Sequence, residues 1–309
     1  MKSLRVCFIG SSFLGAGTLR WLLANQQSLN IEVAAMVGRR ESRSSDDFVD
    51  IIQDVYDPQS AITPFYWESK FNSNELQTII TSANCDIGVC IGWNWLIPSD
   101  VLAAPKFGFI GYHPTLLPSN RGRHPVIWTI QLGLQKTGST LFRLTDGIDD
   151  GPILSQTEFV LDKRETATSL YMRLMSVVPK QLSEVITSEK YRPEFPGLRT
   201  PYTPSVWRGR SRNEGVIDWR ISSDQIDAIV RALSWPYSGA EVWEPRLKRF
   251  SKVRCTEPVY SGQQFRMCTP GQILESEDSA LLVACGDSTA LWIREHSMLD
   301  EYAKGDSLV

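Results

Sequence analysis

The sequence predicts an α/β fold: a Rossmann-like, mostly parallel sheet with flanking helices, plus a smaller C-terminal, mainly β domain that is open barrel-like. Three observations indicate this fold. In the first half, short apolar runs alternate with stretches of helical spacing, which favours right-handed βαβ units and a parallel sheet. A proline-rich stretch follows at 191–204, and beyond it short apolar runs are broken by Gly and Asp.

The alternating elements of the first half can be placed in order. Residues 13–25 have the spacing of an amphipathic helix, and residues 85–93 are nearly all apolar, as expected of a strand covered on both faces. Asp162 and Glu165 have capping-box spacing, which predicts a helix over 166–175. The predicted strands are 4–10, 31–38, 85–93, 107–110, 139–144 and 152–160.

The proline-rich stretch predicts an extended connector, because proline lacks a backbone donor and fixes φ. Residues 1–190 are therefore expected to form the Rossmann-like domain, 191–208 a Pro-rich linker, and 209–309 a C-terminal domain with a helix and a small β barrel. The helix is expected at 222–233, and the strands within 239–243, 271–274, 280–285 and 290–294.

Composition excludes several classes of function. A net charge of −3 over 309 residues gives no general attraction for a polyanion, so no nucleic-acid partner is expected. No apolar run reaches the ~18–20 residues that span a bilayer, and the N-terminal run is too short for a signal peptide. Cys85 and Cys90 form a C-x4-C pair without a second pair, so no metal site is expected. These features predict a reduced, cytoplasmic protein without a membrane partner.

The turn from Gly10 to Gly15 lies between the first strand and the first helix, where dinucleotide folds hold phosphates. One hypothesis is that Gly10, Ser12 and Phe13 contact a substrate phosphate. The other is a tight turn that lets the helix pack closely, because the spacing is G-x4-G rather than G-x-G-x-x-G. The sequence leaves both open.

His113 is the strongest candidate for proton chemistry. It is expected just past an apolar strand, and ligands of open α/β sheets bind at the carboxyl ends of strands. A structural histidine is the alternative. Among Asp146, Asp149 and Asp150, which form an acidic turn, one carboxylate could orient the imidazole. His124 has a weaker case for function, and His296 is expected at the surface.

The stretch H-P-T-L-L-P-S-N-R-G, with I-D-D-G-P-I placing Asp149 36 residues after His113, resembles the folate-dependent formyltransferases. That family includes methionyl-tRNA, glycinamide-ribonucleotide and nucleotide-sugar N-formyltransferases. The runs G-S-S-F-L-G and I-G-W-N-W-L-I-P, and the later G-V-I-D-W and P-Y-S-G-A, also resemble it. The resemblance covers most of the chain.

The resemblance implies transfer of a formyl group from 10-formyltetrahydrofolate to an amine, without a metal. It implies that His113 stabilises the tetrahedral intermediate or moves protons, and that Asp149 orients His113 or relays the proton. Arg121 and Arg123 stand where phosphates of a nucleotide sugar could be held. The residues expected to bind the folate are Trp93, Asn94, Trp95, Leu96, Ile97, Asp146 and Ile148.

The chain departs from the family at Gly111, where the relatives have an asparagine that donates to the developing oxyanion. One oxyanion donor contributes roughly 3–4 kcal/mol to transition-state stabilisation. Asn94, Asn120 or a backbone N–H could substitute, the acceptor or donor could be held differently, or the activity could be lost.

A nucleotide-linked amino sugar is the acceptor that the resemblance favours, because P-Y-S-G-A and R-G-R-x-P look closer to the aminoarabinose type. Methionyl-tRNA is the alternative, and a non-catalytic folate- or nucleotide-binding homologue is a second. The sequence leaves open the sugar, the nucleotide and whether the chain forms a homo-oligomer.

Overall fold

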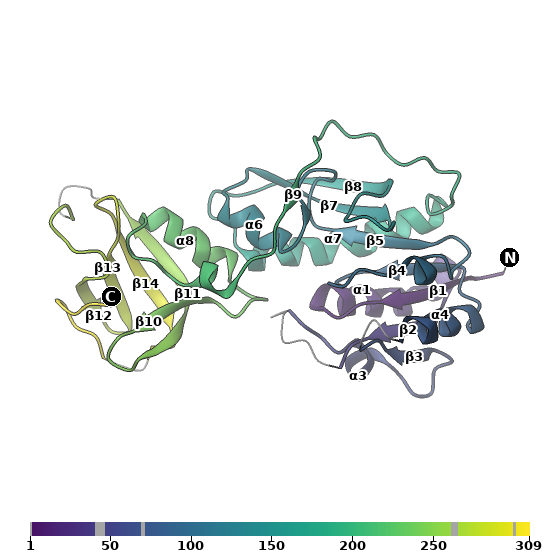
Figure 1. Cartoon of the computed structure of the whole chain (residues 1–309), viewed down its shortest axis with the longest axis horizontal. Helices are drawn as coiled ribbons and strands as arrows, with labels where there is room; N and C mark the ends of the chain where they lie inside the picture. Colours follow the sequence, from purple (N-terminus) through teal and green to yellow (C-terminus); the bar gives the residue numbers. More distant parts are fainter. Residues whose placement is uncertain (1, 41–46, 69–71, 261–264, 299–300) are drawn as a thin grey trace. The chain divides into compact units, whose positions relative to one another are not determined.

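A computed structural model of the chain describes residues 2–40, 47–68, 72–260, 265–298 and 301–309. The chain divides into two compact units (Figure 1). The first comprises Met1–Pro125, Lys136–Val160 and Tyr171–Arg208, and the second comprises Val126–Gln135, Leu161–Leu170 and Gly209–Val309. In the described ranges, no helix is both long and apolar enough to cross a membrane.

The first unit is built on a seven-stranded sheet with the order β3-β2-β1-β4-β5-β7-β8. The pairs from β3 to β5 are parallel, while β5–β7 and β7–β8 are antiparallel. The predicted mostly parallel sheet is thus confirmed, with an antiparallel edge. Its strands are β1 Leu4–Ile9, β2 Ile31–Gly38, β3 Thr63–Tyr66, β4 Ile87–Cys90, β5 Phe109–His113, β7 Lys136–Arg143 and β8 Ile153–Val160.

Two strand boundaries near the sheet's carboxyl edge differ from the prediction. The strand predicted at 85–93 ends at Cys90, since Gly92 takes a φ of 68° that breaks the extended chain. The strand predicted at 107–110 instead runs from Phe109 to His113, because it pairs with β7 as far as His113 opposite Thr140. His113 is therefore the last residue of a strand rather than the first residue of a loop.

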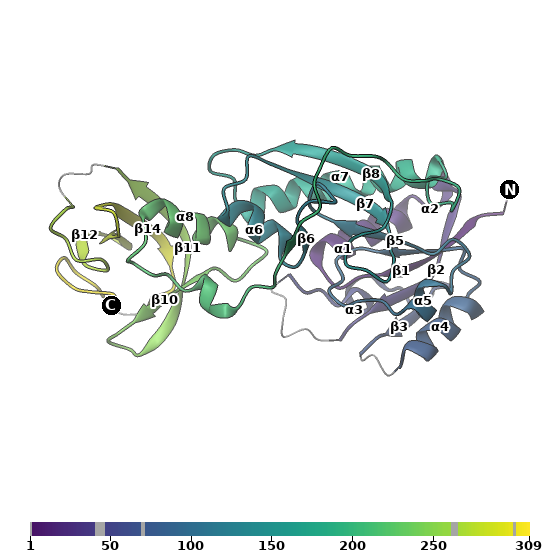
Figure 2. The ribbon, with the colours of Figure 1, turned by 45° about the horizontal axis from the view of Figure 1, so that its top comes forward.

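Helices cover both faces of this sheet (Figure 2). Apolar side chains of α1, α3 and the C-terminal two thirds of α7 pack with strand residues such as Val6, Phe8 and Ile110 in one core. Those of α4 and α5 pack with Ile9 and Phe109 in another. The sequence reading missed several short helices. The helices of the chain are α1 Phe13–Ala24, α2 Gln26–Leu29, α3 Ile51–Val55, α4 Ser73–Ser82, α5 Ser99–Leu102, α6 Pro125–Gln131, α7 Ala167–Thr187 and α8 Ser223–Ala232.

The helix predicted at 166–175 begins at Ala167 and is longer than expected. The proposed capping pair forms only in part: Glu165 Oε2 accepts from the Asp162 N–H at 3.4 Å, in a turn that precedes the helix. The reciprocal bonds at the helix start join Thr166 and Ser169 instead, with each side chain accepting from the other's backbone N–H at 3.0 Å. The spacing rule therefore found the right region but was wrong by one turn.

The second unit contains a five-stranded antiparallel sheet with the order β10-β11-β14-β13-β12, as expected of a mainly β domain. Helix α8 follows a capping box of Ser222 and Gln225, close to the predicted 222–233. The longest strand, β11, was missed because charged and polar residues interrupt its apolar pattern. The strands are β10 Ala240–Glu244, β11 Arg249–Val259, β12 Ile273–Glu277, β13 Ala280–Ala284 and β14 Ala290–His296.

Candidate active site

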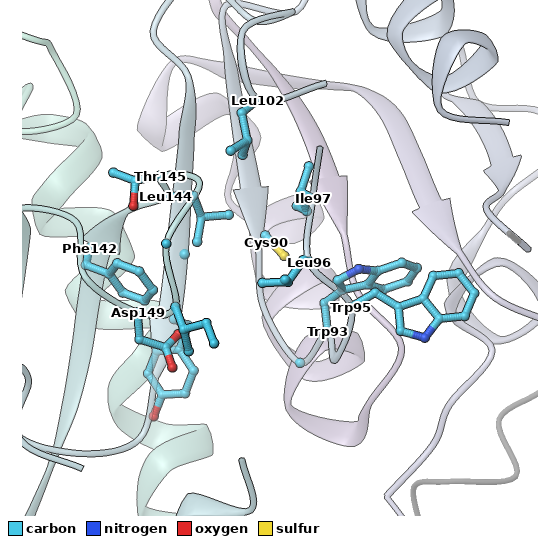
Figure 3. Close-up of a pocket in the computed structure, with 15 residues that line it drawn as sticks. Cys90, Trp93, Trp95, Leu96, Ile97, Leu102, Phe142, Leu144, Thr145 and Asp149 are labelled. Carbon is cyan, nitrogen blue, oxygen red and sulfur yellow. The ribbon is translucent and has the colours of Figure 1, made fainter. Parts of the chain in front are cut away.

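A cavity opens at the carboxyl ends of β4 and β5, with an empty volume of about 550 Å³ that includes space open to solvent. Figure 3 shows Trp93, Trp95 and Leu96 on one side, and Leu144 and Asp149 on the other. The structure thus brings together the two segments expected to wall a folate. The lining residues are Cys90, Gly92, Trp93, Trp95, Leu96, Ile97, Leu102, Gly111, Tyr112, Phe142, Leu144, Thr145, Gly147, Ile148 and Asp149.

One wall of the cavity is stiffened by aromatic side chains. The ring of Trp93 stacks on Trp67 with centroids 5.4 Å apart and meets Trp95 edge to face at 5.7 Å. The guanidinium of Arg39 lies 3.8 Å from the centre of the Trp95 ring, a cation–π contact. Burial lowers the pKa of Arg39. This packing holds the Trp93–Ile97 segment in one place before any ligand binds.

His113 and Asp149 meet at the opposite wall. Nδ1 of the buried imidazole lies 3.4 Å from Oδ2 of Asp149, which also accepts from the Gly122 N–H at 2.9 Å. The other ring nitrogen, Nε2, lies 2.8 Å from the backbone oxygen of Asn120. Asp149 lines the cavity and His113 stands behind it. The acidic turn and the histidine strand, which the sequence could not prove to be neighbours, are in contact.

The hydrogen bond of His113 to Asn120 determines that its Nε2 carries a proton. A carbonyl oxygen only accepts, so the contact with Asn120 requires a proton on Nε2. The other ring nitrogen, Nδ1, faces the Asp149 carboxylate, so both nitrogens are engaged by the protein. Because the protein engages both nitrogens, the cavity meets the carboxylate of Asp149 rather than the imidazole.

Gly111 is closely packed despite having no side chain. A Cβ at this position would lie 2.3 Å from Leu144 Cδ2 and 3.1 Å from Phe142 Cζ. The side chain of Leu144 therefore fills the space into which an asparagine at position 111 would project. The described side chains that meet this Cβ position, Leu144 and Phe142, are apolar and carry no donor.

The two asparagines considered as substitute donors are placed elsewhere. Neither Asn94 nor Asn120 is among the described residues that line the cavity. The side-chain oxygen of Asn94 accepts from Arg39 Nη1 at 3.1 Å, and that of Asn120 accepts from Ser205 Oγ at 3.2 Å. Backbone N–H groups are thus the remaining kind of donor from the three considered.

The Gly10–Gly15 turn fits the packing hypothesis. A Cβ on Gly10 or Gly15 would lie 2.7 or 2.5 Å from the backbone oxygen of Ile91, so the two glycines let α1 approach β4. The Ser12 side chain caps α1 by accepting from Gly15 N–H at 3.2 Å. The first N–H groups of α1, from residues 13 to 16, each have a partner within the chain. Phosphate binding by Gly10, Ser12 and Phe13 would have to displace such bonds.

Arg121 and Arg123 flank the glycine that holds Asp149. Arg121 and Gly122 form the short strand β6, Arg121–Gly122, which pairs in parallel with β9, Val206–Trp207. Arg123 is exposed, and the Nε of Arg121 is buried with no hydrogen-bond partner. Arg121 and Arg123 are therefore the sequence neighbours of Gly122, whose N–H donates to Asp149.

The remaining candidates have other environments. Cys90 lines the cavity, but burial, and secondarily the charge of Asp149, raises the pKa of its thiol, so it is no nucleophile. Ile148 lies on the cavity wall, whereas Asp146 is outside the lining and Asp150 accepts from Thr145 Oγ1. His296 is partly exposed in the second unit. The described residues hold no group of three or more His, Cys, Asp or Glu placed to bind a metal.

Sequence reasoning missed two residues that shape this site. Leu144 carries no motif, and its role depends on its packing against Gly111. Ser205 lies in the predicted linker, and its hydroxyl accepts from the Asn120 N–H at 2.8 Å. No sequence signal identifies either contact, since each joins residues far apart in the chain.

Two protein-family models match the sequence of this chain. A formyl transferase model matches residues 6–186, and a formyl transferase C-terminal domain model matches residues 210–302. The chain belongs to the formyl transferase family. The resemblance read from the His113 and Asp149 motifs is therefore confirmed at the level of the family.

Solved structures of this formyl transferase fold agree. HypX from Aquifex aeolicus, in complex with tetrahydrofolic acid, superposes with a TM-score of 0.65 at 15% sequence identity. The match covers 97% of this chain but only 45% of the HypX chain. The sugar 3N-formyl transferase WlaRD, with dTDP and 5-N-formyl-THF, gives 0.61 at 16%, covering 97% of this chain and 99% of its own. An N-formyltransferase from Helicobacter canadensis, with folinic acid and dTDP-3-aminofucose, gives 0.58 at 14%, covering 94% and 98%. At these identities the likeness is one of fold.

Proposed function

We propose that this protein transfers the formyl group of 10-formyltetrahydrofolate to the amine of a nucleotide-linked amino sugar. The observation that carries the proposal is the cavity that has the aromatic Trp93–Ile97 segment on one wall and the His113–Asp149 pair on the other. WlaRD and the Helicobacter canadensis enzyme, which were solved with folates and dTDP compounds, match nearly the whole of both chains.

The cavity suits a folate donor. It lies at the carboxyl ends of β4 and β5, the edge at which ligands of open α/β sheets bind, and it is open to solvent. Leu96 and Ile148 are lining residues that remain 60% and 51% exposed, so a flat heterocycle could cover their apolar surface. The expected donor contacts come from Trp93, Trp95, Leu96, Ile97 and Ile148. Asn94 and Asp146 do not line the cavity, so we do not assign donor contacts to them.

We assign the proton transfer of the reaction to Asp149 and the positioning of Asp149 to His113. The bound donor supplies a formyl carbon, to which the amine adds and from which N10 departs. Asp149 reaches the cavity and is placed to accept the proton that the amine loses and to return it to N10 as that nitrogen departs. His113 and the Gly122 N–H both contact Oδ2 of Asp149, which leaves Oδ1 to face the amine. In this assignment His113 orients the carboxylate.

The oxyanion of the tetrahedral intermediate needs a donor, and Gly111 supplies no side chain. We assign this role to backbone N–H groups of the 147–149 turn, which lines the cavity beside Leu144. Backbone donors need no reorganisation when the charge develops, so they can replace a side-chain amide. A second candidate function, folate binding without transfer, is favoured by one observation: Leu144 occupies the space next to Gly111.

The phosphates of the acceptor are assigned to Arg121 and Arg123. These cations flank Gly122, whose N–H contacts Asp149, so a phosphate held there lies beside the proton acceptor. Gly10, Ser12 and Phe13 are a weaker assignment, since the amides of that turn have partners within the chain.

Turnover tests the proposal directly. The protein is incubated with 10-formyltetrahydrofolate and a panel of nucleotide amino sugars, and tetrahydrofolate release is followed by absorbance, with mass spectrometry of the sugar. Sugar-dependent release supports the proposal. Tight folate binding without release supports the binding homologue, and formylation of charged initiator tRNA alone excludes the amino-sugar acceptor.

A further inference from the structure

The proline-rich stretch is attached to the first unit rather than hanging free. Residues 198–207, here named the strap, run along β8 and then along the loop 117–122 that follows His113. Leu198 N–H donates to Ile153 O at 2.7 Å, and Tyr202 Oη donates to Glu158 Oε2 at 2.6 Å. At its far end the strap pairs with β6 through β9. The strap is thus attached both to β8 and to the loop that follows His113.

Ser119 Oγ donates to the Thr203 carbonyl of the strap at 2.7 Å, and Ser205 bonds the same loop through several of its atoms. Its N–H donates to Pro118 O at 3.3 Å and its carbonyl accepts from Arg121 N–H at 2.9 Å. Its hydroxyl bonds the residue between them twice, accepting from Asn120 N–H at 2.8 Å and donating to Asn120 Oδ1 at 3.2 Å. The exposed Ser205 therefore hydrogen-bonds both the backbone and the side chain of Asn120.

Asn120 passes this constraint to the reacting pair. Its φ of 62° lies in the left-handed region, a conformation that surrounding contacts must maintain. In that conformation its carbonyl oxygen lies 2.8 Å from Nε2 of His113, which aims the opposite nitrogen at Asp149. Thr115 Oγ1 also donates to this carbonyl at 3.4 Å, and the backbone bond from Arg121 N–H to Ser205 O holds the same peptide unit.

We infer that Ser205 is a positioning residue: its hydroxyl fixes Asn120, and through Asn120 it sets the orientation of His113 against Asp149. The inference rests on the proposed function for its effect on turnover, but not for its effect on the imidazole. It gives the proline-rich stretch a role in the chemistry of the site as well as in joining the two units.

Three variants test the inference. Ser205→Ala removes both bonds to Asn120, while Ser205→Thr keeps the hydroxyl at an exposed position where a methyl group has room. Tyr202→Phe is the matched control, because it removes a strap hydrogen bond to Glu158 that does not involve Asn120. Thermal unfolding of all three variants checks that the first unit is intact.

The primary readout is the His113 ring in ¹⁵N-histidine-labelled protein. The chain has only three histidines, and His113→Asn identifies the signal. In Ser205→Ala, exchange of the Nε2 proton with water is expected to be about five- to tenfold faster, the effect of losing hydrogen bonds of ordinary strength. Ser205→Thr and Tyr202→Phe should keep the wild-type rate. Turnover should fall in Ser205→Ala by a similar factor in kcat, with the KM for the folate unchanged.

The outcomes separate the two proposals. A wild-type ring signal in Ser205→Ala, an equal loss in Tyr202→Phe, or no rescue by Ser205→Thr overturns the positioning role. An altered ring signal with an unchanged kcat overturns its role in turnover. If the wild-type protein transfers no formyl group, the proposed function fails, and the ring signal alone decides whether Ser205 positions His113.

Discussion

The packing around Gly111 yields the sharpest prediction about this protein. An alanine at position 111 would bring its Cβ to 2.3 Å from Leu144 Cδ2 and 2.8 Å from Leu144 Cγ. Contacts below 3.0 Å are essentially never found for a real Cβ, so the Leu144 side chain must move. The backbone itself accepts alanine, since Gly111 is not among the glycines with positive φ.

The magnitude follows from that clash. Gly111→Ala should destabilise the first unit by about 1–3 kcal/mol, the usual cost of overpacking. In a Leu144→Ala background the same change should cost nothing or stabilise by up to about 1 kcal/mol, because the clash is gone and the unfolded chain is stiffened. The two substitutions should therefore couple by roughly 1–4 kcal/mol.

Urea unfolding followed by tryptophan fluorescence measures the double-mutant cycle. Gly17→Ala is a matched control: the added Cβ meets only the flexible end of Met175, at 3.3 Å, in helix α1. It should be neutral or stabilising. Additive free energies for Gly111→Ala and Leu144→Ala would refute the reasoning.

The same pair probes catalysis. With Leu144→Ala making room, Gly111→Asn restores the amide that the relatives are expected to use. An active wild-type enzyme should gain about tenfold or less in kcat, because its backbone donors already contribute, whereas a site that lacks any donor should gain a larger part of the 10²–10³ that one donor provides. A fall in kcat at wild-type folate affinity contradicts the assignment of this space to the oxyanion.

Four further outcomes are expected. Asp149→Asn should lower kcat by about 10²–10⁴ with little change in folate affinity, and near-normal turnover would show that another group takes the proton. Ile148→Ala should raise the KM for the folate by about three- to tenfold through lost apolar contact, and an unchanged KM places the donor elsewhere. Gly15→Ala should lower the urea midpoint, because its Cβ meets the backbone oxygen of Ile91 at 2.5 Å, and a selective loss of sugar affinity at full stability would instead support a phosphate loop. Burial raises the pKa of Cys90, so its thiol should resist iodoacetamide at pH 8 until urea unfolds the protein, and rapid alkylation of the native state would contradict this.

The sequence by itself determined the elements that follow local patterns. Apolar runs placed β1, β2, β4 and β5 of the parallel sheet but not the short edge strand β3. The spacing of His113 and Asp149 identified the formyl transferase family, as did the aromatic run at 93–97. Elements with weak local signals, such as β11 and the short helices, were missed because charged residues or short length hide their periodicity.

Only the tertiary structure decided how the candidate site is arranged. The pairing of β5 with β7 carries the strand to His113, and the turn after β7 brings Leu144 over Gly111 and Asp149 against the imidazole. The strap supplies Ser205 from 85 residues away in the chain. Periodicity reports which side of an element is buried, but not which distant side chain lies against it. For that physical reason the sequence alone showed that Gly111 departs from the family pattern. It could not show that Leu144 fills the space beside that glycine.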